Sequence, residues 1–125
     1  MKKVKFEDLG LMRYKPCWDY QEEVFKDIVS QKIASRKSSA KEENNVHPTS
    51  RLIFVEHPHV LTLGRSGDAS NVIVSPARLA ELGVDYFPIN RGGDITYHGP
   101  GQLVAYPIFD LAQYFTDIHK YLRFL

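Results

Sequence analysis

Residues 91–108 read Arg-Gly-Gly-Asp-Ile-Thr-Tyr-His-Gly-Pro-Gly-Gln-Leu-Val-Ala-Tyr-Pro-Ile and carry the strongest structural signal in the chain. Side-chain character alternates over 94–98, and residues 103–108 form a second, largely apolar run, so each segment is typical of a β-strand. The intervening Gly99-Pro100-Gly101-Gln102 predicts a tight type II turn, because proline fixes φ at one central position and glycine allows a positive φ at the next. The stretch therefore predicts two strands joined as a hairpin.

The residues upstream of this stretch predict further strands and a long helix. Residues 3–8 alternate with period two, which predicts a strand with Val4 and Phe6 facing the core. Residues 52–55 are a continuous apolar run, as expected of a strand that is buried on both faces. A helix is predicted over 16–35, where apolar residues recur at steps of three and four. The apolar positions of this helix are Trp18, Val24, Phe25, Ile28, Val29 and Ile33.

The middle of the chain combines a polar segment with a compact helix. Residues 36–50 contain one branched apolar residue, Val46, so we expect a mobile loop there rather than a linker between domains. Ser75-Pro76 predicts the start of a short helix that ends before Gly83, after which residues 84–88 return as a strand. The predicted fold class is α/β (α+β), a mixed β-sheet flanked by helices.

The last ten residues predict a helix that begins after Thr116. Ile118, Tyr121, Leu122 and Leu125 fall at i, i+3, i+4 and i+7, and no glycine, asparagine or proline ends this stripe. We therefore expect the chain to be the front part of a longer polypeptide and the domain to be incomplete at its C-terminus. The alternative is a natural terminal helix that frays.

Composition limits the class of protein. A length of 125 residues indicates one domain, and 43% hydrophobic with 25% charged residues excludes a disordered or collagen-like chain. The net charge of +1 argues against a dedicated nucleic-acid binder. The single cysteine excludes an internal disulfide, and no apolar run approaches the ~20 residues that cross a bilayer. The expectation is a cytoplasmic protein.

The segment 91–98 is the main candidate for a binding site. Its two adjacent glycines let the backbone approach a ligand and let successive N–H groups point at an oxygen-rich group. Arg91 adds a fixed charge with five donors. Alternation along the strand places His98 at its end, on the face that carries Asp94 and Thr96. The alternative is a turn-rich hairpin with a satisfied histidine. The candidate residues are Arg91, Gly92, Gly93, Asp94, Ile95, Thr96, Tyr97 and His98.

The stretch 56–68 is a second candidate. His57 and His59 lack further partners at a spacing suited to a metal, so no metal site is expected. Gly64-Arg65-Ser66-Gly67-Asp68 is similar to a nucleophile elbow, but Asp68 stands where that motif requires glycine. No Gly-Lys-Ser/Thr follows, which excludes a Walker phosphate loop. Residues 64–67 are therefore either a loop that lines the same pocket as 91–98 or a plain surface loop.

Residues 91–107 closely resemble the signature of lipoyl/octanoyl transferases, the lipoate–protein ligase B family. Residues 56–64, Glu-His-Pro-His-Val-Leu-Thr-Leu-Gly, are similar to the upstream motif of that family, and a weaker match extends over 3–115. The resemblance implies a biotin/lipoate protein ligase-like fold with a pocket at the centre of a mixed sheet. Residues 1–125 would then be the N-terminal part of a single octanoyltransferase catalytic domain.

The resemblance also implies a reaction and its partners. An octanoyl group would pass from octanoyl-acyl carrier protein to an enzyme cysteine, and then to a lysine on a lipoyl domain. Such domains belong to 2-oxoacid dehydrogenases and the glycine cleavage H protein. No ATP, cofactor, metal, nucleic acid or membrane is implied. By similarity, Arg91–His98 would form the wall of the acyl and pantetheine pocket, and His98 would help position the thioester or the attacking amine.

One departure from the family pattern concerns the catalytic groups. The cysteine and lysine motifs of the family lie in the second half of longer chains, and neither occurs here. Cys17, the only thiol, matches neither position and is expected to be a small buried residue. These 125 residues alone are therefore expected to be inactive. The alternatives are a non-catalytic acyl-binding or carrier-docking module and, less favoured because Gly-Pro-Gly-Gln follows His98, an ATP-dependent lipoate ligase.

Overall fold

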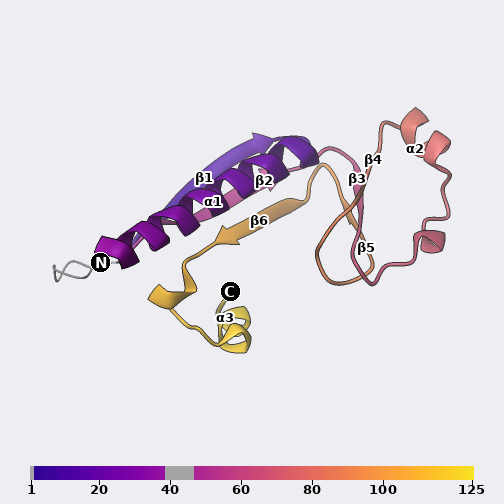
Figure 1. Cartoon of the computed structure of the whole chain (residues 1–125). Coiled ribbons are helices and arrows are strands. Elements are labelled where there is room, and N and C mark those ends of the chain that lie inside the picture. Colours follow the sequence, from indigo (N-terminus) through magenta and orange to yellow (C-terminus); the bar gives the residue numbers. More distant parts are fainter. Residues whose placement is uncertain (1, 39–46) are drawn as a thin grey trace. The chain divides into compact units, whose positions relative to one another are not determined.

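The computed structural model describes residues 2–38 and 47–125, which form two compact units (Figure 1). The first unit is built from the described residues of 1–8, 18–54 and 105–125, and the second from 9–17 and 55–104. The elements are β1 (Val4–Leu11), α1 (Tyr14–Ser38), β2 (Ser50–Glu56), β3 (Val60–Leu63), η1 (Ala69–Asn71), α2 (Pro76–Glu81), β4 (Asp85–Pro88), β5 (Ile95–His98), β6 (Leu103–Ile108), η2 (Leu111–Gln113) and α3 (Ile118–Phe124).

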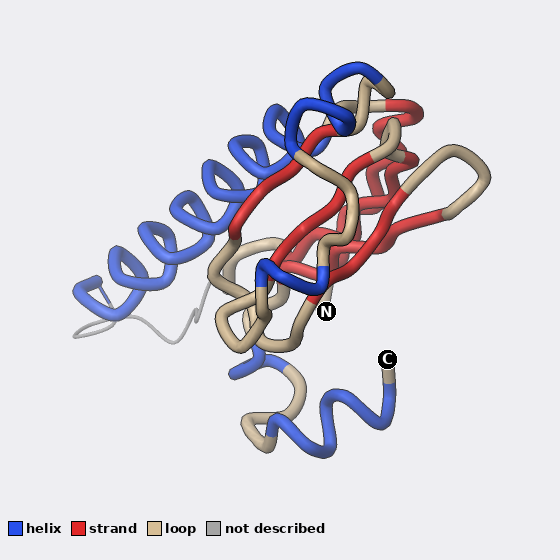
Figure 2. The backbone as a smooth tube through the Cα atoms, turned by 90° about the vertical axis from the view of Figure 1, so that its right-hand side faces the viewer, coloured by secondary structure: helices blue, strands red, loops and turns tan. Residues whose placement is uncertain are grey.

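The first unit contains a three-stranded sheet in the order β1-β2-β6. It also contains most of α1, the longest of the described helices, which is the long blue helix in Figure 2. The predicted strand at 52–55 is therefore confirmed as the central strand, and its Ile53 is fully buried. Val24 and Ile28 of α1 are also buried, at 7% and 6% exposure. Among the described residues, no helix combines the length and apolar composition that a bilayer crossing requires.

The buried face of α1 differs from the predicted stripe. The helix extends beyond 16–35 at both ends, and its buried positions are Cys17, Val24 and Ile28, whereas Phe25 and Ile33 are 57% and 49% exposed. The sequence carries two apolar stripes about one residue apart, and packing selects only one of them. Cys17 is fully buried, at 0% exposure, which confirms the expectation of a small buried residue.

The inward face of β1 was also predicted wrongly. Val4 and Phe6 are exposed, at 43% and 56%, while the carboxylate of Glu7 is largely covered. Glu7 accepts a hydrogen bond from the Tyr20 hydroxyl of α1 and pairs with Arg51 Nη1 at 3.0 Å. The hydrogen bond from Tyr20 is the largest influence on the pKa of Glu7, which is lowered although burial opposes the shift. These partners offset the free-energy cost of burying a charged side chain beside α1. The alternation pattern predicts an apolar residue at that position.

The segment after β6 is fastened by the buried carboxylate of Asp110. Its Oδ1 pairs with Lys32 of α1, and its backbone N–H donates to Ser50 Oγ at 3.1 Å. Burial alone would raise the pKa of Asp110, but Lys32 and the hydrogen bonds from Ala112 and Gln113 lower it overall. Asp110 therefore remains ionised and joins α1, the start of β2 and η2.

The predicted loop at 36–50 is shorter in the structure. Residues 36–38 continue α1, and Ser50, which is fully buried, begins β2. Residues 39–46 lie outside the described part of the chain, so the expectation of mobility there stays a prediction.

The second unit contains a sheet in the order β4-β3-β5. Strand β3 runs parallel to β4 and antiparallel to β5, so the sheet is mixed as predicted. The helix predicted after Ser75 is confirmed as α2, with the Ser75 hydroxyl accepting from Arg78 N at 3.2 Å. Gly83 follows it with φ +66°, in the left-handed region that favours glycine after a helix.

The turn between β5 and β6 is confirmed, but the hairpin is not. Gln102 N donates to Gly99 O at 3.1 Å and Gly101 has φ +86°, as a type II turn requires. Strand β5 pairs with β3, however, while β6 belongs to the β1-β2-β6 sheet. Type II turns do not match the twist of a two-residue β-hairpin, so this turn does not require β5 and β6 to pair.

Helix α3 begins one residue later than predicted. Asp117, not Thr116, caps it by accepting from the N–H groups of His119 and Lys120. The predicted apolar stripe of this helix is largely exposed, with Ile118, Leu122 and Leu125 at more than 60% exposure.

Candidate functional site

The two candidate segments lie side by side in the second unit. Strand β5 pairs antiparallel with β3, with Ile95 opposite Leu63, so the loop that follows β3 meets the loop that precedes β5. The contact continues beyond the strands, because Gly64 N donates to Asp94 O at 3.0 Å and Arg65 N donates to Arg91 O at 2.9 Å. We call residues 64–68 and 91–94 together the paired loops.

Gly64 sits at the closest approach between the paired loops. A Cβ at this position would lie 2.2 Å from Gly93 O and 2.9 Å from Gly92 O, which are backbone atoms that cannot move aside independently. Gly93 adopts φ +87°, whereas nothing lies within 4 Å of a Cβ placed on the exposed Gly92. The three glycines thus have different roles: close approach at 64, a left-handed conformation at 93 and open space at 92.

The guanidinium of Arg91 is bound to the protein itself. Its Nη2 donates to Thr62 Oγ1 at 2.8 Å, to Thr62 O at 3.1 Å and to Asp94 O at 3.1 Å, and its Nη1 donates to Gly92 O at 2.8 Å. Thr62 is buried, with 1% exposure. A planar group with several fixed donors can donate hydrogen bonds to carbonyl oxygens of different segments at the same time. Arg91 therefore holds the loop that carries the glycines.

The carboxylate of Asp94 extends the same contact toward η1. Its Oδ1 accepts from Asp68 N at 3.2 Å and its Oδ2 accepts from Asn71 Nδ2 at 2.9 Å. Ser66 Oγ donates to Gly93 O at 3.1 Å. Backbone and side-chain hydrogen bonds together keep the paired loops in one fixed arrangement.

His57 is fully buried beside the end of β5. Its Nδ1 lies 2.7 Å from Met12 O, and since a carbonyl can only accept, Nδ1 carries the proton. Burial lowers the pKa of His57, the bond to Met12 O opposes that shift, and nearby His98 lowers it further. The two imidazole rings lie 5.9 Å apart, and Tyr14 meets the His57 ring edge-on at 5.3 Å. His57 is therefore a neutral histidine that packs below His98.

Tyr97 and His59 form a second contact at the surface of β5. The Tyr97 hydroxyl lies 2.6 Å from His59 Nδ1, and the two rings stack at 6.0 Å. A Cβ on Gly99 would lie 2.1 Å from that hydroxyl, so the phenol covers the first glycine of the turn. Glu56 Oε1 accepts from Gly101 N at 3.1 Å and fastens the other side of the turn.

The structure brings the predicted candidates into two groups. Arg91, Gly92, Gly93 and Asp94 belong to the paired loops, and His98 lies with His57 beside the turn. Ile95, Thr96 and Tyr97 form β5 between these groups, with Thr96 opposite the buried Thr62. Residues 64–67 lie against the Arg91 segment, and the expectation that the two line one pocket stays a prediction.

Several contributors to this region were missed by sequence reasoning. Thr62 accepts from Arg91, Met12 fixes the proton of His57, and Gln102 contacts His98. No pattern in residues 60–63 marks Thr62 as inward-facing, but the structure buries it at 1% exposure, where a hydroxyl needs a hydrogen-bond partner. The role of Met12 is carried by its backbone carbonyl, so its side-chain identity gives no signal.

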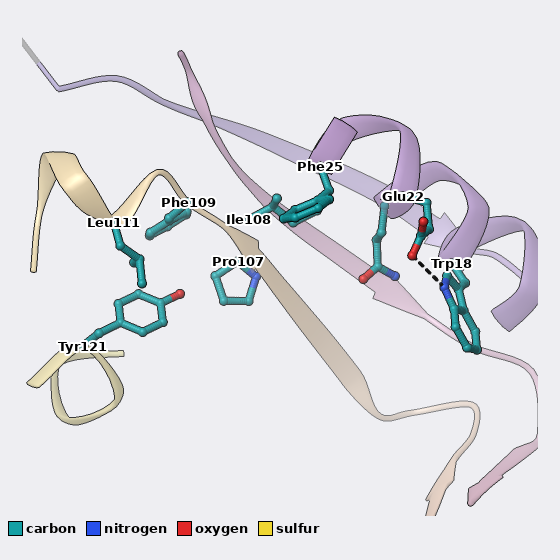
Figure 3. Close-up of a pocket in the computed structure, with 9 residues that line it drawn as sticks. Trp18, Glu22, Phe25, Pro107, Ile108, Phe109, Leu111 and Tyr121 are labelled. Carbon is teal, nitrogen blue, oxygen red and sulfur yellow. Dashed lines mark hydrogen bonds between the residues drawn. The ribbon is translucent and has the colours of Figure 1, made fainter. Parts of the chain in front are cut away.

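Residues 91–98 line neither of two surface hollows. The first, which we call the α1–β6 groove, has a volume of about 390 Å³ and lies in the first unit (Figure 3). The second, about 320 Å³, lies between α2 and β4 in the second unit. Within residues 2–38 and 47–125, no three His, Cys, Asp or Glu side chains are arranged to hold a metal ion. The α1–β6 groove is lined by Trp18, Gln21, Glu22, Phe25, Pro107, Ile108, Phe109, Leu111 and Tyr121.

Comparison with known proteins places this chain in a family. Residues 14–125 match the model of the lipoyl protein ligase A/B catalytic domain. The chain is 55% identical over 124 residues to the octanoyltransferase of Flavobacterium johnsoniae. This match covers 99% of the chain and 52% of that protein. It is 54% identical to the octanoyltransferase of Cytophaga hutchinsonii, covering 99% of the chain and 50% of that protein. The chain thus spans about half the length of these relatives. It belongs to the lipoyl protein ligase A/B catalytic domain family.

Proposed function

We propose that this chain supplies the acyl-binding part of an octanoyltransferase. The donor would be octanoyl-acyl carrier protein, and the acceptor a lysine on a lipoyl domain of a 2-oxoacid dehydrogenase or of the glycine cleavage H protein. The observation that carries the proposal is the pairing of the two sequence motifs. Gly64 ends one motif, and Arg91–Asp94 begin the other. The two segments are in close contact and are joined by backbone hydrogen bonds, although they lie far apart in the sequence.

The proposed binding surface is the segment Arg91–His98. Gly92 is exposed, and nothing lies within 4 Å of a Cβ placed on it, so a ligand chain can approach the backbone there. Arg91 acts by holding that backbone, since its donors are directed at Thr62, Gly92 and Asp94. In this proposal the segment contacts the acyl chain and pantetheine arm of the substrate, while His98 meets one of the reacting groups.

The chemistry needs a thiolate that these 125 residues do not present. In the first step a cysteine thiolate attacks the thioester carbonyl and the pantetheine thiol leaves; in the second, a lysine amine attacks and the enzyme thiolate leaves, forming an amide. Cys17 is fully buried and matches no catalytic motif. We therefore assign the nucleophile to the part of the relatives that this chain does not match, and we expect this chain alone to be inactive.

A chimera tests the proposed activity. This chain is joined to the remaining half of the Flavobacterium johnsoniae octanoyltransferase in place of the 124 residues that it matches. We expect the chimera to move octanoate from acyl carrier protein to a lipoyl domain, as measured by the intact mass of the lipoyl domain. The same chimera with Cys17→Ser should transfer equally well, because the buried Cys17 thiol is not the nucleophile.

Two outcomes would overturn this proposal. A folded chimera that binds octanoyl-acyl carrier protein but never acylates the lipoyl domain would favour the non-catalytic binding module. An octanoyl adduct on Cys17 of the unfused chain, detected by peptide mass spectrometry, would show that the nucleophile lies within these residues.

A further inference from the structure

Gln102 fixes which ring nitrogen of His98 carries the proton. Gln102 Oε1 contacts His98 Nδ1, while Gln102 Nε2 donates to Tyr97 O at 3.4 Å. The carbonyl can only accept, so the amide nitrogen must face Tyr97 and the amide oxygen must face the imidazole. The opposite orientation would place the amide oxygen against the Tyr97 carbonyl oxygen and lose that hydrogen bond, leaving the amide nitrogen to donate to an unprotonated His98 Nδ1.

The orientation of the amide determines the tautomer of His98. An amide oxygen accepts, so His98 Nδ1 carries the proton, and in the neutral ring Nε2 is then the acceptor. Within the described part of the chain, no hydrogen bond occupies His98 Nε2. His98 thus stands beside a rigid turn as a histidine with a defined acceptor nitrogen.

We infer that Gln102 is a positioning residue that directs the Nε2 lone pair of His98 at the attacking lysine amine, rather than at the thioester. The inference rests on the proposed function. The carbonyl oxygen and the sulfur of a thioester can only accept hydrogen bonds, so the Nε2 lone pair would repel them. An amine has N–H groups that Nε2 can accept, and it must lose a proton as the amide forms. The acceptor nitrogen therefore serves the second step of the transfer.

The tautomer can be measured directly on this chain. Long-range 1H–15N correlation of the histidine-labelled protein is recorded about two pH units above the ordinary histidine pKa, ~6.5, so that the rings are neutral. We expect His98 to show a protonated Nδ1 and an unprotonated Nε2. In Gln102→Met the acceptor is gone, and the Nε2–H tautomer should become a major form. His57 is an internal control, because its Nδ1 proton is held by the backbone of Met12 in both proteins.

A matched variant and a conservative variant complete the test. Gln31→Met makes the same change on the exposed side of α1, where Gln31 contacts Asp27 and no histidine, and should leave His98 unchanged. Gln102→Glu keeps an acceptor beside the ring and should retain the Nδ1–H form even if Gln102→Met fails to fold. An Nε2–H tautomer in the unaltered chain would overturn the inference, as would an unchanged His98 spectrum in a folded Gln102→Met.

Transfer by the chimera gives the functional readout. Gln102→Met should slow attack of the lipoyl lysine on the acyl-enzyme by roughly tenfold or more, and slow formation of the acyl-enzyme less. Equal slowing of both steps would contradict the assignment to the amine. An inactive unaltered chimera would instead contradict the proposed function, while the tautomer measurement would still stand on its own.

Discussion

Replacing Gly64 with alanine is expected to lower the free energy of unfolding by about 3 kcal/mol. The added methyl group would lie 2.2 Å from Gly93 O and 2.9 Å from Gly92 O, so the paired loops would have to separate. Separation also breaks the bonds from Gly64 N to Asp94 O and from Arg65 N to Arg91 O. The measurement is the midpoint of urea denaturation, followed by far-ultraviolet circular dichroism.

Gly92→Ala is the matched control for this substitution. It adds the same methyl group to the same pair of loops, but nothing lies within 4 Å of the new atom. Its effect should lie between no change and a gain of about 1 kcal/mol, because alanine restricts the unfolded chain. Equal destabilisation by both substitutions would show that the close approach at Gly64 does not hold the loops together.

Arg91→Lys is expected to destabilise the protein by about 2 kcal/mol despite keeping the positive charge. A lysine ammonium cannot reach Thr62, Gly92 and Asp94 at once in the planar arrangement that the guanidinium uses. The buried Thr62 hydroxyl would lose its donor. Urea denaturation gives the loss of stability, and amide hydrogen exchange should show faster opening at residues 91–95.

Arg78→Lys provides the comparison for that prediction. Arg78 is exposed on α2 and pairs with Glu81 at 2.9 Å, three residues further along the helix. A surface pair of this kind contributes little, so the change should cost less than about 0.5 kcal/mol. If Arg91→Lys were as mild as Arg78→Lys, the guanidinium network would not be what fixes the segment 91–94.

Local signals predicted most of the elements because their causes lie within a few residues. The α2 helix follows from the hydroxyl of Ser75 and from Gly83 just beyond its end, and the turn at 99–102 follows from Pro100 and Gly101. The apolar run 52–55 lies within β2, and β4 covers residues 85–88 of the strand predicted at 84–88. In each case short-range sterics or capping decide the backbone conformation.

Features that depend on distant partners could not be predicted in this way. Strand β5 pairs with β3 rather than with its neighbour β6, and no local pattern encodes that choice. Glu7 lies beneath α1 because Tyr20 and Arg51 satisfy it, and these partners are distant in sequence. The same holds for the candidate site, where the motif residues were identified but the Arg91–Thr62 contact was not.

The site at which the acyl donor binds can be located by nuclear magnetic resonance. The 15N-labelled chain is titrated with S-octanoyl-pantetheine, and shifts of the backbone amide signals are followed. We expect progressive shifts in residues 91–98 and in 64–68, and smaller shifts with pantetheine that lacks the octanoyl group. Shifts confined to the α1–β6 groove around Trp18, Phe25 and Tyr121, with none in 91–98, would contradict this expectation.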